Sequence, residues 1–227
     1  MILAIDTATK WTGLALHDGR SLIAESGWKS SYNQTVELAP ALLQMLHRSK
    51  LTAADLSAVA LAIGPGSYTG LRIGLGFAKG IALANQLQLI GVPTLDILAS
   101  ALPQSEGSLI IAIEAGRTRV WANHYSWIAG KGWESSETPT IQTWEQLLEG
   151  IEGPATIAGE ISPTAKRLIR SAKSQLKPVS PASTARRAGY LAEIGWNRLR
   201  RGWTDDPGEL KPLYLREAVA AAPYPNK

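Results

Sequence analysis

The sequence has no cysteine among its 227 residues, which excludes disulfides and thiolate catalysis. It also has no basic leader, and Asp6 interrupts the first apolar run, so a secretory signal is not expected. No apolar run suits a bilayer, because the longest, 71–90, contains Arg72, Lys79 and Asn85. We therefore expect a cytoplasmic protein that makes no contact with membranes.

Histidine is scarce as well, and His17, His47 and His124 do not lie within one helical turn of one another. A metal site needs several convergent histidine, cysteine or carboxylate ligands, so none is predicted. The HExxH motif of a metallopeptidase and the Gly-Lys-Ser/Thr triplet of a P-loop are both absent. Motif spacing therefore identifies no catalytic residue.

The composition, with 45% hydrophobic and 19% charged residues, is typical of a folded globular protein. Hydrophobic periodicity predicts three opening strands, then a helix, a strand, a second helix and a final strand. The predicted ranges are 2–6, 12–16, 21–25, 33–48, 58–63, 71–85 and 89–92.

The second half is predicted to repeat this order, since Ala112-Ile113-Glu114 answers Ala4-Ile5-Asp6. Its predicted strands and helices are 109–114, 120–125, a strand around Trp133, 144–150, 155–158, 164–176, and a helix 183–201 capped by Ser183. A duplicated βββαβα unit indicates two α/β halves of the actin, sugar-kinase and heat-shock ATPase-like (ribonuclease H-like) superfamily. We place the domains at 1–104 and 105–227, with the last segment a candidate to pack back on the first half.

A glycine-rich segment, Gly64-Pro-Gly-Ser-Tyr-Thr-Gly-Leu-Arg-Ile-Gly74, joins a strand to a helix. Two interpretations are open: a tight turn that uses glycine for its geometry, or a helix start whose N–H groups hold an anion. The segment resembles the GPGSFTGxRIG motif of the TsaB family, with Tyr68 in place of the usual phenylalanine. Further stretches resemble that family in the same order, namely 2–9, 38–40, 91–95 and 212–216.

This resemblance implies a non-catalytic subunit of the complex that forms threonylcarbamoyladenosine in tRNA, at the adenosine next to the anticodon. The implied partners are a TsaD-like catalytic subunit, a TsaE-like ATPase, tRNA through the complex, and a second copy of the chain. The resemblance implies no cofactor for the chain itself. It implies ATP or ADP only in the assembled complex. The catalytic relative TsaD holds a metal through an HxxxH pair, whereas Asn33 and Glu37 stand at that spacing here.

An alternative hypothesis is an independent ATP-using enzyme of the sugar-kinase type. In that case Asp6 would handle a nucleotide-bound metal, and Thr7 and Thr9 would be further cofactor-binding candidates. An ATPase of this fold normally carries glycine next to the acid so that the backbone can approach phosphate, whereas the run 6–10 contains none. Its hydroxyl groups could instead cap the hairpin.

The two helices of the first half are predicted to dock a partner. Apolar residues cover more than one face of 36–46, and glycine recurs in the second helix although each costs about 1 kcal/mol relative to alanine. Internal packing is one explanation, and an interface implied by the family is the other. We expect Gly74→Trp to block docking without unfolding the protein. The predicted interface residues are Val36, Pro40, Leu43, Gly66, Ser67, Tyr68, Thr69, Gly70, Leu71, Arg72, Gly74 and Phe77.

Basic residues concentrate in 163–201, where Glu193 is the one acid. Such a segment attracts phosphate backbones, so it is a candidate for RNA contact. A solvated face of surface helices is the alternative. The basic residues are Lys166, Arg167, Arg170, Lys173, Lys177, Arg186, Arg187, Arg198, Arg200 and Arg201.

Overall fold

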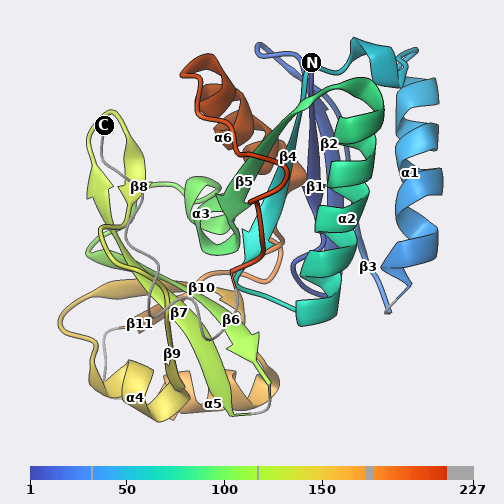
Figure 1. The fold of residues 1–227 in the computed structure, drawn as a ribbon. Coiled ribbons are helices and arrows are strands. Elements are labelled where there is room, and N and C mark those ends of the chain that lie inside the picture. Colours follow the sequence, from blue (N-terminus) through green and yellow to red (C-terminus); the bar gives the residue numbers. More distant parts are fainter. Residues whose placement is uncertain (32, 117, 172–175, 214–227) are drawn as a thin grey trace. The chain divides into compact units, whose positions relative to one another are not determined.

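The computed structural model describes residues 1–31, 33–116, 118–171 and 176–213, which form two compact units (Figure 1). Unit 1 contains Met1–Ile97 and Arg186–Pro212, and unit 2 contains Leu98–Ala185 and Leu213. The boundary near residue 104 stays a prediction. The contacts within the chain add 186–212, near the end of the sequence, to the first unit.

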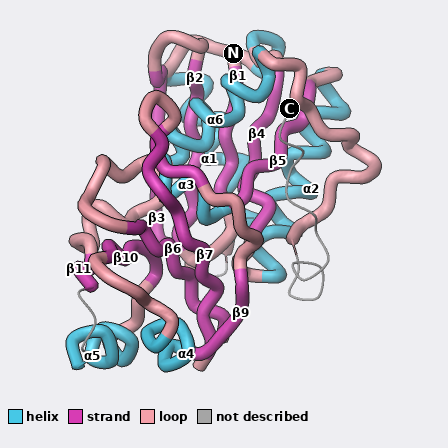
Figure 2. The backbone as a smooth tube through the Cα atoms, turned by 90° about the vertical axis from the view of Figure 1, so that its left-hand side faces the viewer, coloured by secondary structure: helices cyan, strands magenta, loops and turns pink. Residues whose placement is uncertain are grey.

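Five strands form the sheet of unit 1, in the order β3-β2-β1-β4-β5 (Figure 2). β1 pairs antiparallel with β2 and parallel with β4, and β4 pairs parallel with β5. Because β1 and β4 are parallel, Asp6 and Gly64 at their carboxyl ends share one edge of the sheet, the edge at which α/β sheets bind ligands. The strands are β1 Ile2–Asp6, β2 Trp11–His17, β3 Leu22–Lys29, β4 Ala58–Gly64 and β5 Gln88–Pro93.

Helices cover both faces of this sheet, which explains why β1 and β4 are buried along their whole length. Figure 1 shows α1 (Gln34–Arg48) and α2 (Tyr68–Asn85) on one side of the sheet and α6 (Ala188–Arg200) on the other. The face under α6 is rich in alanine. A Cβ atom added to Gly195 of α6 would lie 2.5 Å from the Cβ atom of Ala60, so the helix lies directly on the sheet.

Unit 2 repeats the topology. Its sheet has the order β11-β10-β6-β7-β8, with β9 also paired to β7. β6 pairs antiparallel with β7 and parallel with β10, as β1 does with β2 and β4, so the predicted duplication of α/β halves is confirmed. The elements are β6 Ser108–Ala115, β7 Arg119–Ile128, β8 Gly132–Glu134, β9 Thr140–Thr143, α4 Trp144–Glu149, β10 Ala155–Glu160, α5 Pro163–Ser171 and β11 Leu176–Pro178.

Four elements were not predicted from the sequence: the 3₁₀ helix η1 (Ala53–Asp55), α3 (Thr94–Ser100), β9 and β11. The predicted cap of the last helix is wrong. Ser183 lies in a turn, in which its N–H donates to Ser180 O, and α6 begins only at Ala188. The packing of the last segment and the stretch from 214 onward lie outside the described residues. Among the described helices, none has the length and hydropathy needed to cross a membrane.

Candidate functional site

The turn between β4 and α2 fixes the start of α2. Ser67 caps α2, its side chain accepting from Gly70 N over 3.2 Å, as expected for a serine in this position. Its own N–H donates to Ala8 O in the β1–β2 loop over 2.6 Å. The turn is therefore attached both to the helix that follows it and to the carboxyl edge of the sheet.

Glycines just before α2 and along one side of it allow the β1–β2 loop to pack closely against the helix. An added Cβ atom would lie 2.1 Å from Ala8 O at Gly66, 2.2 Å from Thr7 O at Gly70 and 2.1 Å from Thr7 Oγ1 at Gly74. At distances below 3 Å the structure has to shift: the backbone would have to move for a side chain at Gly66 or Gly70, and the Thr7 side chain for one at Gly74. The expectation that Gly74→Trp would leave a folded protein is therefore wrong, because Gly74 is buried against Thr7.

The opposite side of α2 and the adjoining side of α1 carry exposed apolar residues. Val36 and Leu43 of α1 are 69% and 67% exposed, and Leu83 of α2 is 84% exposed. Gly76 and Gly80 lie on the exposed side of α2, and a Cβ atom at either would meet no atom within 4 Å. Because α1 and α2 are in contact, we call this surface the α1–α2 face. It consists of Val36, Pro40 and Leu43 with Thr69, Arg72, Gly76, Gly80 and Leu83.

The predicted interface residues divide by exposure. Gly70, Leu71 and Gly74 are buried inside unit 1, while Gly66 and Phe77 are half-buried. The exposed members are Val36, Pro40, Leu43, Ser67, Tyr68, Thr69 and Arg72. At the start of α2, the Arg72 guanidinium lies 4.2 Å from the centroid of the Tyr68 ring, a cation–π arrangement at the surface. The interface itself stays a prediction.

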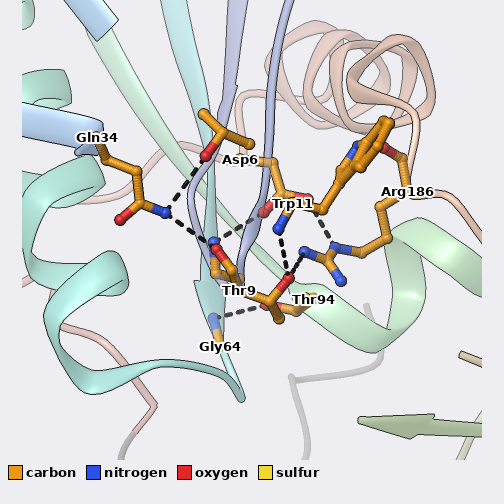
Figure 3. A network of polar contacts seen from close by, with 9 residues as sticks. Asp6, Thr9, Trp11, Gln34, Gly64, Thr94 and Arg186 are labelled. Carbon is orange, nitrogen blue, oxygen red and sulfur yellow. Dashed lines mark hydrogen bonds and ion pairs between the residues drawn. The ribbon is translucent and has the colours of Figure 1, made fainter. Parts of the chain in front are cut away.

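A buried polar cluster lies at the carboxyl end of β1 (Figure 3). Arg186 Nε donates to Asp6 Oδ2 over 2.7 Å, and the two side chains are 1% and 0% exposed. Asp6 Oδ1 accepts from Ala8 N over 2.9 Å, and Arg186 Nη2 donates to Thr9 Oγ1 over 2.8 Å. Trp11 Nε1 donates to Arg186 O over 2.7 Å. A residue 180 positions away therefore neutralises the acid at the sheet edge.

The cluster extends from the β1–β2 loop to α1 and α2. Gln34 at the start of α1 donates from Nε2 to Thr9 O over 3.0 Å, and Thr7 Oγ1 donates to Gly70 O in α2 over 2.8 Å. The side chains of all three cofactor-binding candidates, Asp6, Thr7 and Thr9, are thus engaged inside unit 1. Sequence reasoning missed Arg186, whose place in a run of basic residues gave no sign that it is buried.

The residues of the basic segment divide between the two units. Arg186 is buried, and Arg198 donates from Nη1 to Gly91 O. Arg187 forms an ion pair with Glu25, and the hydrogen bond to this carboxylate raises the pKa of the Arg187 guanidinium above its ordinary value. Arg167, Arg170 and Lys177 are exposed in unit 2, and Arg200 and Arg201 in unit 1.

No group of three or more histidine, aspartate or glutamate side chains that could hold a metal ion occurs among residues 1–31, 33–116, 118–171 and 176–213. At Asp6 the charge of the carboxylate is already balanced by Arg186. The α1–α2 face, in contrast, is an apolar surface that is exposed to solvent.

Comparisons with known proteins agree with the predicted family. The family model described as TsaD, tRNA N6-adenosine threonylcarbamoyltransferase, matches residues 29–222. The tRNA threonylcarbamoyladenosine biosynthesis protein TsaB of Escherichia coli (strain K12) is 34% identical over 100% of this chain and 99% of its own length. TsaB of Bacillus subtilis (strain 168) is 28% identical over 98% of this chain and 97% of its own.

Among solved structures, YeaZ from Pseudomonas aeruginosa superposes with a TM-score of 0.77 at 22% identity, covering 94% of this chain and 99% of that one. This likeness concerns the fold, and with the duplicated topology it confirms the predicted α/β class of two repeated halves. The sequence matches extend along the whole chain rather than over one motif. The chain therefore belongs to the TsaB family, among the proteins that the TsaD model describes.

Proposed function

We propose that this chain is a non-catalytic subunit in the biosynthesis of tRNA threonylcarbamoyladenosine, and that it docks a TsaD-like catalytic subunit through the α1–α2 face. Membership of the TsaB family supports the pathway, since curated relatives carry that name. The observation that carries the docking surface is the exposure of Val36, Leu43 and Leu83 on two adjacent helices. Through this partner the chain would recruit a TsaE-like ATPase and contribute to modification of tRNA in the cytoplasm.

The exposed glycines support a partner at this face. Gly76 and Gly80 have no internal packing reason, and each costs the helix about 1 kcal/mol relative to alanine. Small residues allow another backbone to approach closely, and apolar side chains beside them supply the area that an interface buries. A second copy of the chain presents the same face, so a homodimer would compete with the TsaD-like subunit for it.

The test is titration of the purified chain against the TsaD-like protein of the same organism, followed by tRNA modification with all components. Leu83→Asp and Gly76→Trp should each weaken binding by about tenfold or more, because Leu83 is the most exposed apolar side chain of the proposed face and Gly76 lies midway along its α2 residues. Both positions are exposed, so the variants should remain folded. The matched control is Ile23→Asp, an exposed apolar residue of the edge strand β3, which should bind normally.

Two outcomes would contradict the proposal. The first is full tRNA modification by the TsaD-like protein without this chain. The second is equal binding by Leu83→Asp and the Ile23→Asp control, which would place the interface elsewhere on the molecule.

A further inference from the structure

Asp6 keeps the acid of the superfamily in a setting that differs from a metal site. It ends β1 at the carboxyl edge of the sheet, where an ATPase of this fold would use the acid to handle a nucleotide-bound metal. Its carboxylate is completely buried, and a buried carboxylate is strongly destabilising unless a positive charge accompanies it. In this chain the positive charge is the guanidinium of Arg186.

Both oxygens of Asp6 already have partners in the protein. Oδ2 accepts from Arg186 Nε and Oδ1 accepts from Ala8 N. A divalent cation at this carboxylate would have to displace Arg186, because two cations beside one buried carboxylate repel each other.

The space around the pair is occupied as well. Arg186 is held at both ends, since Thr9 Oγ1 accepts from Nη2 and Trp11 Nε1 donates to the backbone oxygen. Gly13 pairs with Asp6 across the hairpin, and a Cβ atom there would lie 3.2 Å from the Cβ atom of Ala188 in α6. The first glycine after Asp6 is thus covered by a helix and does not open the backbone to a phosphate.

The repeat in unit 2 shows that burial and pairing are particular to Asp6. The corresponding acid, Glu114, is exposed and accepts from Ser162 N over 3.0 Å. The same topology therefore does not by itself place a guanidinium against the acid that ends the first strand.

We propose that Arg186 is a built-in cation that occupies the metal position at Asp6 and thereby closes unit 1 to Mg-nucleotide. The carboxylate of Asp6 then serves to balance the charge of Arg186 and to hold the β1–β2 loop through Ala8 N, and not to bind a nucleotide. This inference concerns unit 1 alone and does not depend on which partner the α1–α2 face binds.

Replacing the arginine tests the inference, with Mn²⁺ alone as the probe and its electron paramagnetic resonance signal as the readout. Arg186→Ala removes the cation and leaves a carboxylate beside a cavity, so Mn²⁺ should bind about tenfold or more tightly than to the double variant Asp6→Asn with Arg186→Ala. Arg186→Lys keeps the charge and should exclude Mn²⁺ as the wild-type protein does. Equal Mn²⁺ binding by the Ala variant and the double variant would overturn the proposal.

A second measurement uses the wild-type protein and is independent of whether Arg186→Ala folds. In a calorimetric titration with Mg-ATP, the wild-type protein should show no binding that depends on the carboxylate of Asp6. Saturable Mg-ATP binding that is lost in the double variant Asp6→Asn with Arg186→Met would overturn the proposal. That variant removes both charges together, so it avoids an unpaired buried charge and should fold. Circular dichroism checks its fold before titration.

Discussion

The hydroxyl oxygen of Thr7 lies 2.1 Å from the point at which a side chain at Gly74 would begin. Thr7 is 1% exposed, and its hydroxyl donates to Gly70 O one turn earlier in α2. The close approach of α2 to the β1–β2 loop therefore depends on glycine at position 74. Two residues further along the same helix, Gly76 faces open space.

This contrast predicts opposite effects of one substitution at two neighbouring positions. Gly74→Ala should lower the free energy of unfolding by about 1–3 kcal/mol, because Thr7 must rotate and lose its hydrogen bond to Gly70. Gly76→Ala is the matched control and should raise it by about 0.5–1 kcal/mol through helix propensity. Urea unfolding of the two variants measures both changes. Equal stabilisation at both positions would show that the loop adapts to a side chain.

The first-half elements were predictable because their signals are local. Each buried strand is a short apolar run, although the predicted start of the second helix at 71 missed the Ser67 cap and the first turn of α2. The missed elements had no such signal: β9 has four residues, two of them threonine, and α3 follows β5 without an intervening turn. Tertiary pairing and packing, rather than their own sequence pattern, define these elements.

Acid should destabilise the protein in part through two exposed turns. Asp18 accepts from the N–H groups of Arg20 and Ser21, which lower the pKa of its carboxyl below the ordinary 3.8. The Thr52 N–H lowers the pKa of Asp55 in the same way. A carboxyl with a lower pKa in the folded state stabilises the fold above 3.8, and this contribution is lost as the pH falls through the folded-state value.

The double variant Asp18→Asn with Asp55→Asn tests this pH dependence. Its melting temperature should lie below that of the wild-type protein near neutral pH, and the two curves should converge as the pH falls below 3.8 and the carboxylates of the wild type become protonated. Thermal unfolding followed by circular dichroism across this range gives the comparison. A difference that is the same at every pH would mean that the charge of these residues is not what stabilises the turns.

Close packing of α6 on the sheet of unit 1 predicts a large effect at Gly195. A Cβ atom there would lie 2.5 Å from Ala60 Cβ and 2.9 Å from Ile2 Cδ1, so Gly195→Val should lower the free energy of unfolding by about 2–3 kcal/mol or more. Asn197→Ala, two residues along on the exposed side, is the control and should change it little. Hydrogen exchange should localise the effect of Gly195→Val to β1 and β4. A normal exchange pattern in these strands would contradict the assignment of α6 to this sheet.

The site was less predictable than the fold, because its main contact joins residues far apart in sequence. Asp6 was identified from its place at the end of a strand, but Arg186 belongs to a run of basic residues in which no pattern separates a buried arginine from a solvated one. The sequence likewise did not distinguish the buried glycines of α2 from the exposed ones. Only the neighbours of each glycine in space separate Gly70 and Gly74, which admit the loop, from Gly76 and Gly80, which leave the surface open.

Glu25 and Arg187 should not contribute equally to stability although they form one ion pair. Arg187 is 56% exposed, and exposed pairs contribute at most about 1 kcal/mol, so Arg187→Ala should cost less than that. Glu25 also accepts from Gly189 N over 2.8 Å in the first turn of α6, where helix N–H groups need an acceptor from outside the helix. Glu25→Ala should therefore cost about 1–2 kcal/mol.

Glu25→Gln separates the two contributions of Glu25, because it keeps an acceptor for Gly189 N and removes the charge that attracts Arg187. Its stability should lie close to that of Arg187→Ala, and well above that of Glu25→Ala. Urea unfolding of the three variants at low and high salt distinguishes the terms, since salt screens the ion pair and leaves the hydrogen bond to Gly189 largely intact. If Glu25→Gln is as destabilised as Glu25→Ala, the ion pair rather than the helix-end hydrogen bond fastens α6 to β3.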